Sequence, residues 1–369
     1  MKKIALLLGS LALAATSFAG GKEIVPVEVE VIEIVREVPV YRNVTNGGFI
    51  QLQYKWWGRS TKDDNYRRSA VGNRGRLELL GGVNLTENQR FEFRVRDHHA
   101  VGRRIGTGVN ETGRTHISDS TAVRLRHYYQ HDFAGLTARS RIQYRNDGDS
   151  YGATTHSDTW INDIEHNLEY SFEMQFAEYG FDNDFIRTRT LTFAPKVGYS
   201  WAHSGGDGGR AYYYGADLLV NHALPLNFGL ETNVYLSSVH ANRHYFDFKK
   251  SQLQVDVEVL LTNKTPIIQG DRTTLSFAFE GGYDSYKMSN RKMFDYAART
   301  NIGSRWEYDS KSKYSLYAQP SLVVDYQATD NVNLFVGAGA EWRNVVEVSQ
   351  EAQGWEVQPV GWAGFRVNF

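Results

Sequence analysis

The chain has 369 residues, of which 41% are hydrophobic, 13% aromatic and 22% charged, and it contains no cysteine. Without cysteine it forms neither a disulfide framework nor a thiolate metal site. Its 41 basic and 42 acidic side chains nearly cancel, so it lacks the basic excess that nucleic-acid binding needs, and we expect no nucleic-acid partner. No apolar run reaches the roughly 18 residues of a membrane-spanning helix. A soluble globular protein and a transmembrane β-barrel, which needs no such run, both remain.

Residues 1–19 are predicted to form a secretory signal peptide. Lys2 and Lys3 precede an apolar stretch, 4–15, that is too short to span a bilayer. Residues 17–19 (Ser-Phe-Ala) have the small-x-small form of a signal-peptidase site, so we expect cleavage after Ala19. The alternative is a buried N-terminal helix. Loss of the two lysines leaves 39 basic and 42 acidic side chains, a mature net charge near −3.

Residues 20–46 differ in composition from the rest of the chain. Within 25–40 Val and Ile alternate with Glu, which favours an extended strand. Two prolines and five glutamates in the segment argue against a central strand. We interpret 20–46 as a periplasmic segment before the main domain, 47–369, with a docked strand or a short helix as the alternatives.

From Gly47 onward the hydrophobic pattern has a period of two. Residues 50–56 read Ile-Gln-Leu-Gln-Tyr-Lys-Trp, in which every second side chain is apolar, as in a half-buried strand. Residues 158–182 could form one strand or two, and their unbroken parity favours one. The expected strands are then fourteen: 47–58, 72–85, 89–99, 119–131, 135–146, 158–178, 186–202, 210–224, 226–240, 246–262, 271–288, 311–327, 331–346 and 354–369.

The connections between these strands alternate between short and long. Tight turns are expected at 85–89, 130–134, 179–185, 224–226 and 328–331. Longer polar connections are expected at 59–71, 99–118, 147–157, 203–209, 241–245, 289–310 and 347–353. Short turns at one end and long loops at the other, with an even strand count, are typical of bacterial outer-membrane barrels.

Aromatic and polar side chains distinguish a membrane barrel from a soluble β fold. Trp and Tyr of the apolar parity gather near the strand ends, among them Trp56, Tyr199 and Trp342, as expected of girdles at membrane–water interfaces. Arg, Glu, Gln and Asn recur at strand centres, where a dry core would make each charge cost several kcal/mol. We therefore predict an all-β fold, a transmembrane antiparallel β-barrel of about 14 strands.

The end of the chain has the pattern of an assembly signal. Phe365, Val367 and the terminal Phe369 alternate with Arg366 and Asn368. This resembles the C-terminal signal of outer-membrane barrels that the barrel assembly machinery reads. It supports export to the bacterial outer membrane, with outer-membrane lipid and that machinery as partners.

Four stretches resemble the FomA-type major outer-membrane porins of fusobacteria. They are the opening Met-Lys-Lys-Ile-Ala-Leu-Leu-Leu-Gly-Ser, the Val/Glu-rich segment, residues 51–58 (Gln-Leu-Gln-Tyr-Lys-Trp-Trp-Gly) and residues 212–220 (Tyr-Tyr-Tyr-Gly-Ala-Asp-Leu-Leu-Val). The resemblance implies a pore for small hydrophilic solutes and a surface role in adhesion between cells.

Parity also assigns the charged side chains that would face the lumen. A basic wall is expected from Arg76, Arg94, Arg96, Arg124, Arg126, Arg139, Arg141 and Arg145. An acidic wall is expected from Asp217, Glu231, Asp256, Glu258 and Glu280. Opposed charges across an aqueous pore create a transverse field that would select solutes. The alternative is that these groups form inter-strand ion pairs that stiffen the wall.

Catalytic and metal sites find little support in the sequence. Asp97 and His99 share a strand face at the outer rim, where an Asp/His pair could activate water, but solvation of the rim is the preferred interpretation. His240 and His244 have helical metal-ligand spacing in a strand–loop region. No Gly-x-Ser-x-Gly or nucleotide motif occurs. We predict no enzyme, no catalytic residue, no cofactor and no metal.

Two functional hypotheses follow. The preferred one is a passive diffusion porin for small hydrophilic solutes and ions, with a homotrimer expected only by analogy with general porins. The alternative is an adhesin that binds partners on other cells through loops 59–71, 99–118 and 289–310, with the barrel as its anchor. Two loops are candidates for constricting the pore, and the sequence does not decide between them. They are 99–118, which holds Arg103, Arg104 and Arg114, and 289–310.

Overall fold

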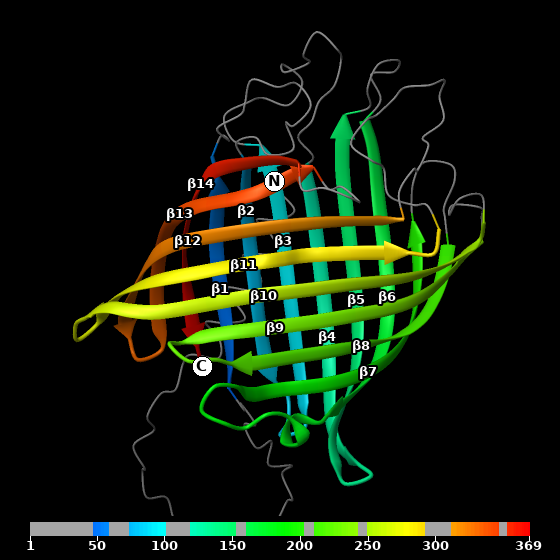
Figure 1. Cartoon of the computed structure of the whole chain (residues 1–369), viewed down its shortest axis with the longest axis horizontal. Coiled ribbons are helices and arrows are strands. Elements are labelled where there is room, and N and C mark those ends of the chain that lie inside the picture. The colour runs from blue at the N-terminus through cyan, green and yellow to red at the C-terminus, as the bar shows by residue number, and fades with distance from the viewer. Residues whose placement is uncertain are drawn as a thin grey trace, which may run out of the picture.

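The computed structural model describes residues 47–58, 74–100, 119–152, 160–202, 210–242, 249–291, 311–346 and 353–369. These residues form fourteen antiparallel strands in one closed barrel (Figure 1). The strands are β1 (Gly48–Trp57), β2 (Arg74–Asn84), β3 (Gln89–Ala100), β4 (Asp119–Phe133), β5 (Leu136–Gly152), β6 (Trp160–Gln175), β7 (Arg187–Ala202), β8 (Arg210–Ala223), β9 (Phe228–Ala241), β10 (Ser251–Gln269), β11 (Thr273–Ser289), β12 (Ser312–Thr329), β13 (Val332–Val346) and β14 (Gln353–Asn368). The predicted fold class and strand number are confirmed. The predicted signal peptide and periplasmic segment lie outside the described residues.

Each strand pairs with its neighbours in sequence, and the first strand pairs with the last. In Figure 1 the strands β7 to β13 cross in front of β1 to β6. At the seam, the Gly48 amide donates to the Phe369 carbonyl at 2.6 Å, and the Phe369 amide donates to the Gly48 carbonyl at 3.0 Å. Closure leaves none of the fourteen described strands with an unpaired edge, which is what a sheet in hydrocarbon requires.

Most strand ends lie within a few residues of the predicted positions, with four corrections. β6 ends at Gln175 instead of 178, and a short 3-10 helix, η2 (Ala177–Tyr179), follows it. β4 runs to Phe133, and the turn is Ala134–Gly135 with φ of 52° and 82°, the positive values of a two-residue hairpin turn. β5 continues to Gly152 instead of ending at 146. β10 continues to Gln269, past the predicted end at 262, because a register shift between Pro266 and Ile268 accommodates the proline within the strand.

The two faces of the barrel wall have opposite polarity. Apolar side chains are exposed on one face, such as Ile142 at 53% and Val197 at 55%, whereas Glu173 and Glu341 are buried at 1% and 2% on the other. The Lys55 ammonium donates to the Gln319 side chain at 3.0 Å. β1 and β12 are separated by β14 and β13, so this contact spans the concave side and places the polar face inside. A polar interior and an apolar exterior define a transmembrane barrel.

Aromatic rings line the outer face near the long connections. Trp342 and Trp355 stack with ring centroids 4.2 Å apart, and Trp342 is 47% exposed. Histidines are interleaved with these rings, since His240 stacks on Tyr212 at 5.0 Å and on Tyr214 at 5.5 Å. Such rings have an apolar body and a polar edge, which suits a membrane interface. Among the described residues, no helix is long and apolar enough to cross a membrane.

Candidate functional site

The eight arginines of the predicted basic wall lie on four consecutive strands, β2 to β5. Register brings several of them side by side, because Arg94 lies opposite Arg124 and Arg124 lies opposite Arg145. Arg96 lies opposite Glu78 and is ion-paired with it. The basic side chains therefore gather on the inner face of β2 to β5, where Glu78 and Glu92 interrupt them.

The five carboxylates of the predicted acidic wall also lie on consecutive strands, β8 to β11. Tyr235 of β9 lies opposite both Asp217 and Asp256. Glu258 lies opposite Asn233 on the same face, and Glu231 lies two residues from Asn233 along β9. The sign of the inner charge thus changes between β5 and β8.

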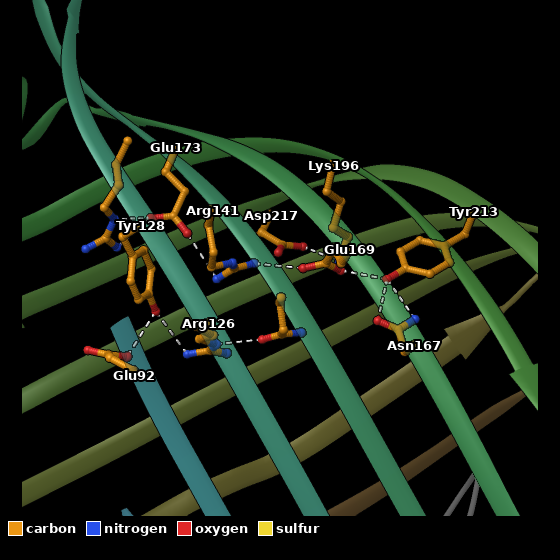
Figure 2. Close-up of polar contacts among 12 residues, drawn as sticks. Glu92, Arg126, Tyr128, Arg141, Asn167, Glu169, Glu173, Lys196, Tyr213 and Asp217 are labelled. Atoms are coloured by element: carbon orange, nitrogen blue, oxygen red, sulfur yellow. Dashed lines mark hydrogen bonds and ion pairs between the residues drawn. The ribbon is translucent and has the colours of Figure 1, made fainter. Parts of the chain in front are cut away.

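Ion pairs join the basic wall on β5 to carboxylates of the neighbouring strand β6 (Figure 2). Arg139 donates from Nε to Glu173 Oε2 at 2.7 Å. Arg141 reaches Glu173 Oε1 at 3.0 Å and Glu169 Oε1 at 2.8 Å. The contacts of Arg139, Arg141, Glu169 and Glu173 therefore agree with the alternative interpretation of the sequence, in which inter-strand ion pairs stiffen the wall.

Inward tyrosines hold several of the carboxylates, and the sequence analysis did not single them out. Tyr213 donates its hydroxyl to Glu169 Oε2 at 2.8 Å, next to Asn167 in Figure 2. The same contact recurs along the inner face, at 2.9 Å from Tyr235 to Glu258, 2.6 Å from Tyr317 to Glu280 and 3.2 Å from Tyr128 to Glu92. The alternation of the strand could have predicted that Tyr213 points inward, because it lies between the outward Tyr212 and Tyr214.

A cavity of about 700 Å³ opens on the inner face between β4 and β9. Arg126, Arg139 and Arg141 line it from β4 and β5, whereas Asp217 and Glu231 line it from β8 and β9. Lys196 of β7 also lines it and is ion-paired with Asp217 at 2.5 Å, with both side chains less than a tenth exposed. The cavity is therefore bordered by arginines on β4 and β5 and by carboxylates on β6, β8 and β9, with Lys196 paired to Asp217 between them.

Near the seam, the charged side chains of the inner face also pair with one another. Arg343 contacts Glu341 at 3.0 Å and Asp284 at 2.8 Å. Gln358 donates to Glu341 Oε1 at 2.9 Å, and Trp57 donates its indole N–H to Glu341 Oε2 at 3.3 Å. These contacts tie β1, β11, β13 and β14 together where the barrel closes.

The rim residues considered for catalysis or metal binding lie on the outer face. His99 stacks on Tyr54 with centroids 5.7 Å apart and approaches Asp97 at 3.7 Å, so the two share a face as expected. His240 lies among outward tyrosines, and its expected companion His244 lies outside the described residues. No group of three or more metal-binding side chains occurs in the part of the chain that the structure describes.

The C-terminal residues lie on the outward face of β14 and at its end. Phe365 lies opposite Leu52 and Val367 opposite Ile50, and Phe369 is 51% exposed. The loops proposed for adhesion or constriction, 59–71, 99–118 and 289–310, lie largely outside the described residues.

Comparison with known proteins yields likeness in structure only. No protein-family model and no curated protein matches the sequence. Similar solved structures include CdiB from Acinetobacter baumannii (TM-score 0.44, 10% identity, 87% of this chain and 60% of that chain). They also include the CymD monoaromatic hydrocarbon channel (0.41, 8%, 88% and 88%) and the outer membrane channel DcaP of Acinetobacter baumannii (0.33, 12%, 88% and 96%). With TM-scores below 0.5, these matches leave the function to be inferred from the residues of this chain.

Proposed function

We propose that this protein is a porin of the bacterial outer membrane that forms a water-filled channel for passive diffusion of small hydrophilic solutes and ions. The observation that carries the proposal is the polarity of the barrel wall, with charged and polar side chains on its inner face and exposed apolar side chains on its outer face. A dry interior would make these charges costly, whereas an aqueous lumen solvates them.

The mechanism follows from the charges around the cavity. Arg126 faces it from β4, and Glu231 faces it from β9. At an effective dielectric constant of about 20, a unit charge on a solute about 10 Å from one of these groups interacts with it by about 1.7 kcal/mol. This energy is large enough to orient a polar solute and small enough to release it. Solutes that keep their hydration or align their dipoles would therefore pass most readily.

The experiment is single-channel recording of the refolded protein in a planar bilayer, with reversal potentials under a salt gradient. We expect stable ohmic steps. Arg126→Gln should shift selectivity toward cations and Glu231→Gln toward anions, because each removes a charge from the cavity wall. An inserted, folded barrel without conductance would exclude the porin and leave the adhesin, with its partners on other cells.

The same proposal assigns partners to the outer surface. The exposed apolar face and its aromatic rings would contact outer-membrane lipid. The side chains of Phe365, Val367 and Phe369 would serve as the signal for the barrel assembly machinery. Deletion of Phe369 should then slow assembly into liposomes by purified machinery while leaving spontaneous refolding in detergent unchanged. Equal rates with the machinery would contradict this role.

A further inference from the structure

Three arginines on the inner face form a compact cluster, which we call the arginine triad: Arg94, Arg124 and Arg126. Arg94 on β3 lies directly opposite Arg124 on β4. Arg126 lies two residues further along β4, so its side chain emerges from the same face. All three side chains are half-buried. Like charges placed directly opposite each other destabilise a sheet unless something compensates them.

Within the described ranges, the triad has no carboxylate partner. Arg126 donates to the Gln143 side chain at 2.6 Å and contacts the Tyr128 hydroxyl at 3.4 Å, both neutral acceptors. The Nε atom of Arg94 is buried and has no hydrogen-bond partner. Three positive charges therefore face the lumen, and the Nε donor of Arg94 is left over.

The neighbouring carboxylates are already engaged by other side chains. Glu78 is ion-paired with Arg96. Glu92 accepts from Arg90 at 2.8 Å and from Tyr128 at 3.2 Å. Glu92 lies opposite Arg126 in the register, but neither carboxylate forms an ion pair with a member of the triad.

Other cations on the inner face differ from the triad because they are paired with carboxylates. Arg141 contacts two carboxylates, Lys196 contacts Asp217, and Arg343 contacts two carboxylates. A wall that neutralises these cations within itself but leaves three adjacent guanidinium groups without an acid is suited to receive an external anion.

We propose that the arginine triad is a saturable binding site for phosphate-bearing small solutes, and in particular for diphosphates. This inference rests on the proposed function, since the solute reaches the site through the lumen. Guanidinium groups bind phosphate oxygens in a bidentate way. Adjacent strands are about 4.8 Å apart and alternate residues about 6.8 Å apart. Because the guanidinium groups end long side chains, the terminal oxygens at the two ends of one diphosphate can contact two or three members of the triad at once.

The test is isothermal titration of inorganic pyrophosphate into the refolded protein in a phosphate-free detergent. We expect saturable binding of one pyrophosphate per chain. Arg94→Gln and Arg124→Gln should each weaken it at least tenfold. The matched control is Arg366→Gln, which removes one inner positive charge whose guanidinium lies over Phe49 at 4.0 Å, outside the triad. This control should change the affinity less than twofold.

Folding of each variant is checked by heat-modifiable mobility in gels, and channel recordings are made with and without pyrophosphate. A wild-type channel that conducts but shows no saturable binding overturns the site and leaves the porin standing. Binding without conductance supports the site and refutes the porin. Equal weakening by Arg366→Gln and the triad variants also overturns the site, because the effect would then be one of net charge.

Discussion

Glu173 is the residue whose replacement tests the inner ion-pair network most sharply. Its side chain is 1% exposed and contacts both Arg139 and Arg141. Glu173→Gln keeps the volume of the side chain and removes its charge. Arg141, 10% exposed, then keeps only Glu169 as an ionic partner, while Arg139, 41% exposed, turns to water.

The magnitude follows from these exposures. Removing one partner of a buried ion pair costs about 3–5 kcal/mol because the other charge is left uncompensated. The half-solvated Arg139 adds little, since exposed pairs contribute about 0–1 kcal/mol. Arg141 retains one carboxylate and glutamine still accepts a hydrogen bond, so we expect a loss of about 2–3 kcal/mol in the free energy of unfolding.

The assay is equilibrium urea unfolding in lipid vesicles, followed by tryptophan fluorescence. Glu87→Gln is the control, because Glu87 is exposed in the β2–β3 turn, and surface changes usually stay within about 0.5 kcal/mol. If Glu173→Gln unfolds at the same urea concentration as Glu87→Gln, the network contributes no stability and the reasoning is refuted.

Two further predictions concern packing and charge on the same face. A Cβ on Gly337 would lie 2.2 Å from the Trp362 ring, so Gly337→Ala should lower the free energy of unfolding by about 1–3 kcal/mol. Gly361→Ala, whose added Cβ would lie 3.8 Å from its nearest atom, should lower it much less. Equal urea midpoints for the two variants would refute the close packing at Gly337. Lys196→Met leaves the buried Asp217 without its ammonium partner and should cost about 3 kcal/mol in vesicle unfolding, whereas an unchanged midpoint would show that the pair is not buried as described.

The period-two pattern predicted most of the fold, because each inner or outer position follows from its neighbour by alternation. It failed at strand ends, where local geometry decides. Ala134 enters the left-handed region to complete a two-residue turn, and a bulge carries β10 past Pro266. The alternation of apolar and polar residues predicts neither the turn nor the bulge, so the predicted ends of β4 and β10 were wrong.

The candidate site was predictable only as two sets of charges. Parity places Arg141 and Glu173 on one face, but contact between them depends on the register of β5 against β6, in which Arg141 lies opposite Ser171 and Arg139 opposite Glu173. That register depends on the length of the connection and on side-chain packing, neither of which the sequence pattern fixes. The ion pairs at β5–β6 therefore emerged only from the structure.

The polar face of the barrel should line an aqueous channel, and the apolar face should contact lipid. The chain contains no cysteine, so a single introduced thiol reports one position. Asn221 lines the cavity, and Val336 is 52% exposed on the outer face. The measurement is single-channel current before and after a charged methanethiosulfonate reagent is added to Asn221→Cys and Val336→Cys. We predict a stepwise fall in current for Asn221→Cys and none for Val336→Cys. A fall for Val336→Cys, or an unchanged current for both, would contradict this arrangement.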